Sequence, residues 1–170
     1  MVVLFSDRKS NTEKEIIEIL KKHGGDYISD KTVHSSKGLF TVVSEYKITD
    51  IKIRAGAAVF TDDTLRFRGQ ILPKEIIGIC ESQNRSALEI FEKNKTPVIS
   101  CGMNPKNTLT VSSLSGNNVL LSLQRTVTTL FGTDTEPCEM NIKLSKTYTP
   151  FSIMASAALL LIHGITPQEF

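Results

Sequence analysis

The stretch EIIGICESQNRSALEIFEKNKTPVISC, residues 75–101, decides the fold class of this chain of 170 residues. An apolar run at 76–80 comes first, apolar residues recur at helical spacing within 86–93, and a second apolar run follows at 98–101. An uninterrupted apolar run is typical of a strand that is buried on both faces. A strand, a helix and a second strand in this order predict two parallel strands joined by a right-handed crossover.

Two further apolar runs add strands to the same sheet. Residues 2–5 precede a polar turn and a predicted helix at 12–23, where Ser10 and Glu13 form a capping-box pattern. Residues 57–60 are again uninterruptedly apolar. We therefore expect both runs in the central sheet.

The segments between these runs are more polar. Residues 26–37 are polar and rich in turn-forming residues, and the sequence leaves the placement of 26–55 open. Residues 40–46 and 48–54 alternate apolar and polar side chains, which predicts a hairpin half exposed to water. Residues 65–73 read as a connecting loop.

The pattern changes after the strand-helix-strand unit. Residues 108–113, 119–123 and 139–144 alternate, which predicts antiparallel strands added to one edge of the sheet. Residues 150–163 form the last predicted helix, and 166–169 resemble the start of another helix that does not develop. The sequence therefore predicts a single α/β domain over residues 1–170, with a mainly parallel sheet flanked by helices and antiparallel hairpins at one edge.

Composition excludes several classes of partner. The net charge of +2, from 20 basic and 18 acidic residues, supplies no basic field for nucleic acid. No apolar run approaches the ~20 residues of a membrane span, and the N-terminus lacks a signal-peptide pattern, so we expect no membrane contact. Three cysteines without a CxxC pair fit the reducing cytoplasm.

A family resemblance rests on the second half of the chain. The strand VISCG at 98–102 precedes the alternating strands and the alanine-rich helix FSIMASAALLLIHGI at 151–165. This order resembles the end of the central domain of Mur ligases, the ATP-dependent amide-forming enzymes of peptidoglycan precursor synthesis, and of their folylpolyglutamate synthetase relatives. Upstream, AAVFTD at 57–62 looks like the strand of that family that ends in Thr-Asn, and 77–84 like the strand before its Asn-Ala-Asp-Asp element. The resemblance implies a P-loop-like α/β fold.

The chain departs from this family where ATP would bind. The family has a GxxGKT phosphate loop after its first strand, whereas this chain has SDRKSNT at 6–12, with no glycine and with only Thr12 matching. Asp7 would repel a phosphate there. The magnesium-binding Glu and His of the family have no clear counterparts, and its C-terminal ligase domain is not expected in this chain. We therefore expect no ATP-dependent ligation and no cofactor, and we assign no catalytic residue.

Candidate ligand-binding residues follow from the sheet. Ligands of open α/β sheets bind outside the carboxyl ends of the parallel strands, because loops and helix N-termini meet there. Residues at or just beyond the predicted strand ends are the candidates. They are Asp7, Thr12, Asp62, Asp63, Cys80, Glu81, Asn84, Cys101 and Asn104.

Each candidate chemistry has a simpler alternative. Cys80 or Cys101 could act as a nucleophile with Glu81 as its base, or both could be small core residues. Asp62 and Asp63, with Asp7 and Glu81, could bind a divalent cation, or could simply end a strand in a turn. The three histidines are far apart in the sequence, so we expect no metal site on them.

Three functions remain open at this point. The first is a non-catalytic Mur-ligase-like domain that binds a small ligand or a protein partner, with a regulatory role linked to cell-envelope precursor metabolism. The second is a small thiol- or carboxylate-dependent enzyme that uses the carboxyl edge of the sheet. The third is a structural module whose edge strands pair between copies into a homo-oligomer.

Overall fold

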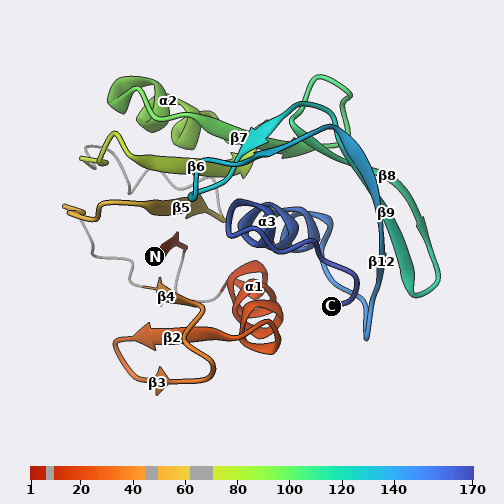
Figure 1. Cartoon of the computed structure of the whole chain (residues 1–170), viewed down its shortest axis with the longest axis horizontal. Coiled ribbons are helices and arrows are strands. Elements are labelled where there is room, and N and C mark those ends of the chain that lie inside the picture. The colour runs from red at the N-terminus through yellow and green to blue at the C-terminus, as the bar shows by residue number, and fades with distance from the viewer. Residues whose placement is uncertain (7–9, 45–49, 62–70) are drawn as a thin grey trace.

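The computed structural model describes residues 1–6, 10–44, 50–61 and 71–170. Its helices are α1 (Asn11–Lys22), α2 (Arg85–Asn94) and α3 (Pro150–Ile162). The strands are β1 (Val2–Phe5), β2 (Gly25–Ser29), β3 (Val33–His34), β4 (Phe40–Ser44), β5 (Gly56–Phe60), β6 (Ile76–Glu81), β7 (Val98–Gly102), β8 (Leu109–Ser115), β9 (Asn118–Leu123), β10 (Val127–Thr128), β11 (Asp134–Thr135) and β12 (Cys138–Lys143). Within the described residues, ten of them form one sheet in the order β12-β9-β8-β7-β6-β5-β1-β4-β2-β3 (Figure 1). β10 and β11 pair in a separate two-stranded sheet.

The middle of the large sheet is parallel. β1 pairs in parallel with β4 and β5, β5 with β6, and β6 with β7. The β6-α2-β7 crossover confirms the prediction from residues 75–101, and the other two apolar runs are β1 and β5. All four residues of β1 and all five of β5 are buried, because helices cover both faces of the sheet here.

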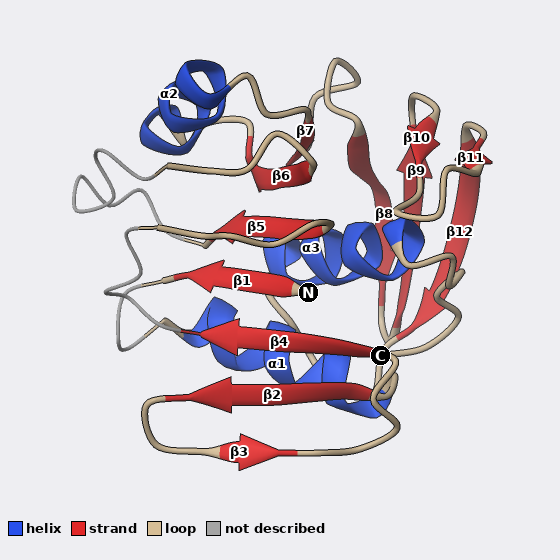
Figure 2. Ribbon diagram, turned by 60° about the vertical axis from the view of Figure 1, so that its left-hand side comes forward, coloured by secondary structure: helices blue, strands red, loops and turns tan. Residues whose placement is uncertain are grey.

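The antiparallel strands lie at one edge, as predicted. β8 continues the parallel sheet beside β7, and β9 and β12 then add antiparallel to it. Figure 2 shows these strands turned away from the direction of β1, β4 and β2, so the sheet curves around α3. Gly116 has φ 57°, and such a left-handed conformation favours glycine in the tight β8-β9 turn.

The prediction of a hairpin at 40–54 was wrong. Residues 40–44 form a parallel strand between β1 and β2 instead of a hairpin arm, and 51–54 form no strand; residues 45–49 lie outside the described part. The alternation in β4 arises because Phe40, Val42 and Ser44 are buried while the residues between them are half-buried. The turn-rich segment at 26–37 contains β2 and β3, which tolerate polar side chains because they lie at the sheet edge.

The last residues of the chain pair with β12. Residues 166–169 start no helix; they run beside β12, where Lys143 N donates to Gln168 O at 2.9 Å and Phe170 N donates to Lys143 O at 2.8 Å. The Phe170 side chain is buried, and burial of this aromatic ring holds residues 166–169 in an extended conformation. Of the predicted loop at 65–73, residues 65–70 lie outside the described part.

Two apolar clusters occupy the two faces of the sheet. α1 and α3 pack side by side in the larger cluster, and α2 covers the opposite face over the smaller one (Figure 1). Every residue of α3 from Phe151 to Ile162 is buried. Ala155, Ala157 and Ala158 provide the close approach that such a buried helix requires. No helix of the described part is long and apolar enough to cross a membrane.

His163, at the end of α3, makes unfolding sensitive to pH. Its Nδ1 donates to Leu159 O at 2.7 Å, and its Nε2 is buried with no hydrogen-bond partner in the described structure. Burial, opposed by the Leu159 bond, lowers the pKa of His163 below its ordinary value. The unfolded chain therefore binds a proton near pH ~6.5, where the folded chain does not. The contribution of neutral His163 to the free energy of unfolding is fully present above that pH and is lost as the pH falls below it.

We expect urea unfolding at pH 5.5 to give a lower free energy of unfolding than at pH 7.5. His163→Phe keeps an aromatic ring beside Phe40, whose ring centroid lies 4.7 Å from that of His163. This variant is expected to flatten the pH dependence, because it removes the titrating group. An unchanged slope in the variant would show that another group is responsible.

Candidate functional site

A cavity of about 710 Å³ lies at the carboxyl ends of the parallel strands. The ends of β5, β6 and β7 form one side of it, and the first turns of α1 and α3 form the other. Its polar lining includes Thr12, Thr61, Glu81, Ser82, Gln83, Asn104 and Thr149, and its apolar lining includes Met103, Pro105, Phe151 and Met154. The arrangement provides hydroxyl, amide and carboxylate groups beside an apolar wall.

The structure brings four of the predicted site residues together. Thr12, Glu81, Cys101 and Asn104 border this cavity, although they come from α1, β6, β7 and the loop after β7. Cys80 lies outside its lining. The predicted residues Asp7, Asp62 and Asp63 fall outside the described part of the chain.

Asn84 has a structural role that accounts for its position. Its side-chain oxygen accepts a hydrogen bond from Ala87 N at 2.9 Å, so it is the N-cap of α2. Only 5% of Asn84 is exposed. Its position just after β6 is therefore explained by its role as the residue that starts α2.

The two cysteines of adjacent strands are buried in different clusters. Glu81 is the register partner of Cys101, so Cys80 points to the opposite face and packs beneath α2. Cys101 belongs to the cluster on the α3 face and has no exposed surface. Burial, and then the charge of Glu81, raises the pKa of Cys80 to about 12. Burial likewise raises the pKa of Cys101, so neither thiol ionises near neutral pH.

Alkylation distinguishes these thiols from an activated nucleophile. With iodoacetamide at neutral pH, we expect Cys138 to react, because it is exposed, and Cys80 and Cys101 to stay unmodified until the chain is denatured. Mass spectrometry of the peptides measures the modification at each site. Cys138→Ser is the control and should leave the folded protein unreactive. Rapid modification of Cys101 in the folded protein would instead support the hypothesis of a thiol-dependent enzyme.

Glu13 is a site residue that the sequence interpretation missed. It lies in the first turn of α1, and its two carboxylate oxygens accept hydrogen bonds from the Ser6 and Ser44 hydroxyls. These serines stand at the carboxyl ends of β1 and β4 and are buried. The capping-box pattern predicts a carboxylate directed back to the helix start, but only Glu13 N reaches Ser10 Oγ, at 3.4 Å. The Glu13 carboxylate therefore occupies the end of β1, where the family resemblance places a phosphate loop.

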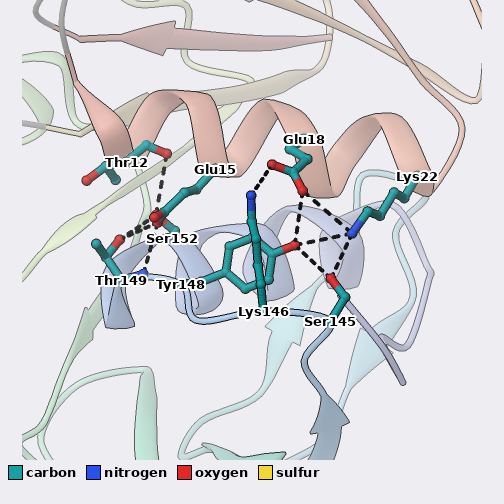
Figure 3. A network of polar contacts seen from close by, with 9 residues as sticks. All are labelled: Thr12, Glu15, Glu18, Lys22, Ser145, Lys146, Tyr148, Thr149 and Ser152. Atoms are coloured by element: carbon teal, nitrogen blue, oxygen red, sulfur yellow. Dashed lines mark hydrogen bonds and ion pairs between the residues drawn. The ribbon is translucent and has the colours of Figure 1, made fainter. Parts of the chain in front are cut away.

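Glu15, two residues after Glu13 on α1, occupies a second anion position. Thr149 N and Thr149 Oγ1 donate to the same carboxylate oxygen of Glu15, at 2.9 and 2.8 Å (Figure 3). Thr149 is the N-cap of α3 but makes no side-chain cap hydrogen bond to its own helix. A negative charge at a helix N-terminus interacts favourably with the helix dipole. Glu15 therefore supplies α3 with the anion that its N-terminus attracts.

The polar network continues along α1 toward the segment before α3. Glu18 contacts the Lys146 Nζ at 2.5 Å, and Lys22 Nζ lies within hydrogen-bond distance of Ser145 and Tyr148, at 3.0 and 3.2 Å (Figure 3). The hydrogen bond from Lys146 is the main cause that lowers the pKa of Glu18. These side chains are partly exposed, so water screens their interactions. The network links α1 to the segment that precedes α3.

A metal site finds no support among the described residues. No group of three or more His, Cys, Asp or Glu side chains gathers there. The proposed cluster of Asp7, Asp62, Asp63 and Glu81 stays a prediction, because only Glu81 belongs to the described part.

Comparison with known proteins identifies the fold. No family model matches the chain, and no curated protein matches it. Among solved structures, a murein peptide ligase from Psychrobacter arcticus 273-4 superposes with a TM-score of 0.63 at 11% identity, covering 98% of this chain and 45% of that one. The UDP-N-acetylmuramate:L-alanyl-gamma-D-glutamyl-meso-diaminopimelate ligase from Neisseria meningitides gives 0.60 at 12%, covering 99% and 62%. MurF ligase from Thermotoga maritima, in complex with ADP, gives 0.57 at 10%, covering 99% and 46%.

These similarities define architecture and no more. The chain spans less than two thirds of the length of each of these ligases. At 10–12% identity, a shared fold does not carry shared chemistry. The order of helices and strands and the curved mixed sheet agree with the family resemblance that residues 98–165 carry. The chain therefore has a Mur ligase-like α/β fold, of the kind that forms the central domain of those enzymes.

Proposed function

We propose that this chain is a non-catalytic Mur ligase-like domain that binds a small, non-anionic ligand in the carboxyl-edge cavity. One observation carries the proposal: the chain places carboxylates of its own, Glu13, Glu15 and Glu81, around the edge where a ligase of this fold would hold phosphates. Glu13 and Glu15 accept hydrogen bonds from serine and threonine residues of the protein. ATP-dependent ligation is therefore disfavoured.

Electrostatics defines the class of ligand. A helix N-terminus is normally a ready site for phosphate, but Glu15 already fills that role at α3. A phosphate at the end of β1 would meet the Glu13 carboxylate, and like charges at close range repel. Glu81 lines the cavity itself and attracts a cation instead. An uncharged or positively charged ligand avoids these repulsions.

The remaining lining favours a ligand with hydroxyl or amide groups and one apolar face. Thr12, Ser82 and Gln83 offer hydrogen bonds, while Phe151 and Met154 offer apolar contact. Amino sugars and N-acetylated sugars have this combination. The superposed ligases act on cell-envelope precursors according to their names, so a regulatory role that senses a nucleotide-free precursor fragment is our proposal for the pathway.

Thermal unfolding in the presence of ligands tests the proposal. We expect glucosamine or N-acetylglucosamine to raise the melting temperature, by roughly 5–10 °C at a concentration near 100 Kd, as mass action predicts. ADP with magnesium and UDP-N-acetylmuramate are expected to give no shift. Glu81→Gln should weaken the binding of glucosamine and leave that of N-acetylglucosamine unchanged. Glu92→Gln, on the exposed side of α2, is the matched control.

Saturable binding of ADP by the unaltered chain would overturn the proposal, because a nucleotide site would then have survived. If neither sugar binds, the proposed ligand-binding function is wrong, and binding of a protein partner becomes the next hypothesis to test.

Pairing of edge strands between copies also stays a prediction. β3 and β12 are the outer strands of the sheet, and sizing the protein in solution decides whether copies associate.

A further inference from the structure

A separate groove of about 430 Å³ lies at the opposite edge of the sheet, where β6 and β7 begin. Ile77, Ile99 and Val127 contribute apolar wall, and Arg125 is the single charged residue of the described lining. The first residues of β6 and β7 line this groove, whereas the last residues of these strands line the carboxyl-edge cavity. The groove therefore needs an explanation of its own.

Arg125 retains binding capacity for an anion. Its Nη1 donates to the backbone oxygen of Lys106, a neutral partner that orients the guanidinium. Within the described residues, no carboxylate lies within ion-pair distance of Arg125. Glu136 accepts a hydrogen bond from Thr126 Oγ1 at 3.0 Å. A guanidinium presents five N–H donors in a planar fork that matches a carboxylate.

We propose that this groove binds a small apolar carboxylic acid, with its alkyl or aryl chain along Ile77, Ile99 and Val127 and its carboxylate on Arg125. The apolar wall favours removal of a hydrocarbon chain from water. Arg125 is exposed, so the charged head group is bound without being buried. A phosphate-rich ligand would gain nothing from the apolar wall, and a neutral hydrocarbon would gain nothing from Arg125. This site is independent of the proposed function.

Calorimetric titration with hexanoate, octanoate and decanoate, below their micelle concentrations, tests the assignment. We expect one saturable site whose affinity rises by up to about fourfold for each added methylene. Octanol, which has the same chain without the charge, should bind at least about tenfold more weakly, and Arg125→Gln should weaken octanoate binding by a similar factor. Ile77→Trp fills the groove and should abolish binding.

Arg85→Gln is the matched control, because Arg85 is also an exposed arginine but starts α2 at the carboxyl edge. It should bind octanoate like the unaltered chain. Melting curves of each variant verify that it is folded. Equal binding by the unaltered chain and Arg125→Gln, equal binding of octanol and octanoate, or no saturable binding would each overturn the proposal. Binding of a leucine-terminated peptide without binding of octanoate would also overturn it.

Discussion

Phe91→Ala is expected to lower the free energy of unfolding by about 3–5 kcal/mol, the range for truncation of a fully buried phenylalanine. Phe91 lies on α2 and has no exposed surface. Its ring meets that of Phe60 edge-on at 5.2 Å, and Phe60 stacks on Phe5 at 4.6 Å. These three rings join α2 to β5 and β1. The variant leaves a cavity where the crossover helix contacts the sheet.

Urea unfolding measures this effect, and Leu88→Ala is the matched control. Leu88 lies on the same helix but is half-buried, so we expect a smaller loss. A loss below about 1 kcal/mol for Phe91→Ala would show that the ring is not packed as described.

Gly78 provides a second test of the same contact. A Cβ at this position would lie 2.6 Å from Phe91 Cε1. We therefore expect Gly78→Ala to cost about 1–3 kcal/mol in the unaltered chain and much less together with Phe91→Ala. Strictly additive effects would contradict the contact.

Glu15→Ala is expected to lower the free energy of unfolding by about 1.5–3 kcal/mol, because it removes two charge-assisted hydrogen bonds from Thr149 and leaves the Thr149 N–H without its acceptor. The N-terminus of α3 also loses a favourable charge. Since Thr149 and Thr12 both line the carboxyl-edge cavity, ligand binding there should weaken as well.

Glu18→Ala is the matched control for this prediction. Glu18 lies one turn away on the same helix, but its ion pairs with Lys22 and Lys146 are formed by partly exposed side chains, which contribute little. Glu15→Gln keeps an acceptor without the charge and should fall between the two. If Glu15→Ala and Glu18→Ala lowered the free energy of unfolding by equally small amounts, Glu15 would not be stabilising the N-terminus of α3.

The site was harder to predict than the fold. Thr12, Glu81, Cys101 and Asn104 could be selected because strand ends are visible in the sequence and meet at one sheet edge. Glu13 and Glu15 could not be selected, because their partners are distant in the chain: Ser44 is 31 residues from Glu13, and Thr149 is 134 residues from Glu15. No local sequence pattern indicates a hydrogen bond between residues so far apart in the chain. Asn84 was selected for its position, whereas the structure makes it a helix cap.

The sequence predicts the parallel core, since apolar runs such as 2–5, 57–60 and 76–80 are too short for a helix and are typical of strands buried on both faces. It also determined the antiparallel edge and the three helices, through alternation and helical spacing. The position of residues 40–44 could be found only in the folded chain, because alternation does not distinguish a hairpin arm from a parallel strand with one less buried face. The positions of the α1 carboxylates likewise depend on the folded chain. Their partners are chosen by the packing of α1 against the strand ends and α3, which depends on contacts across the whole chain.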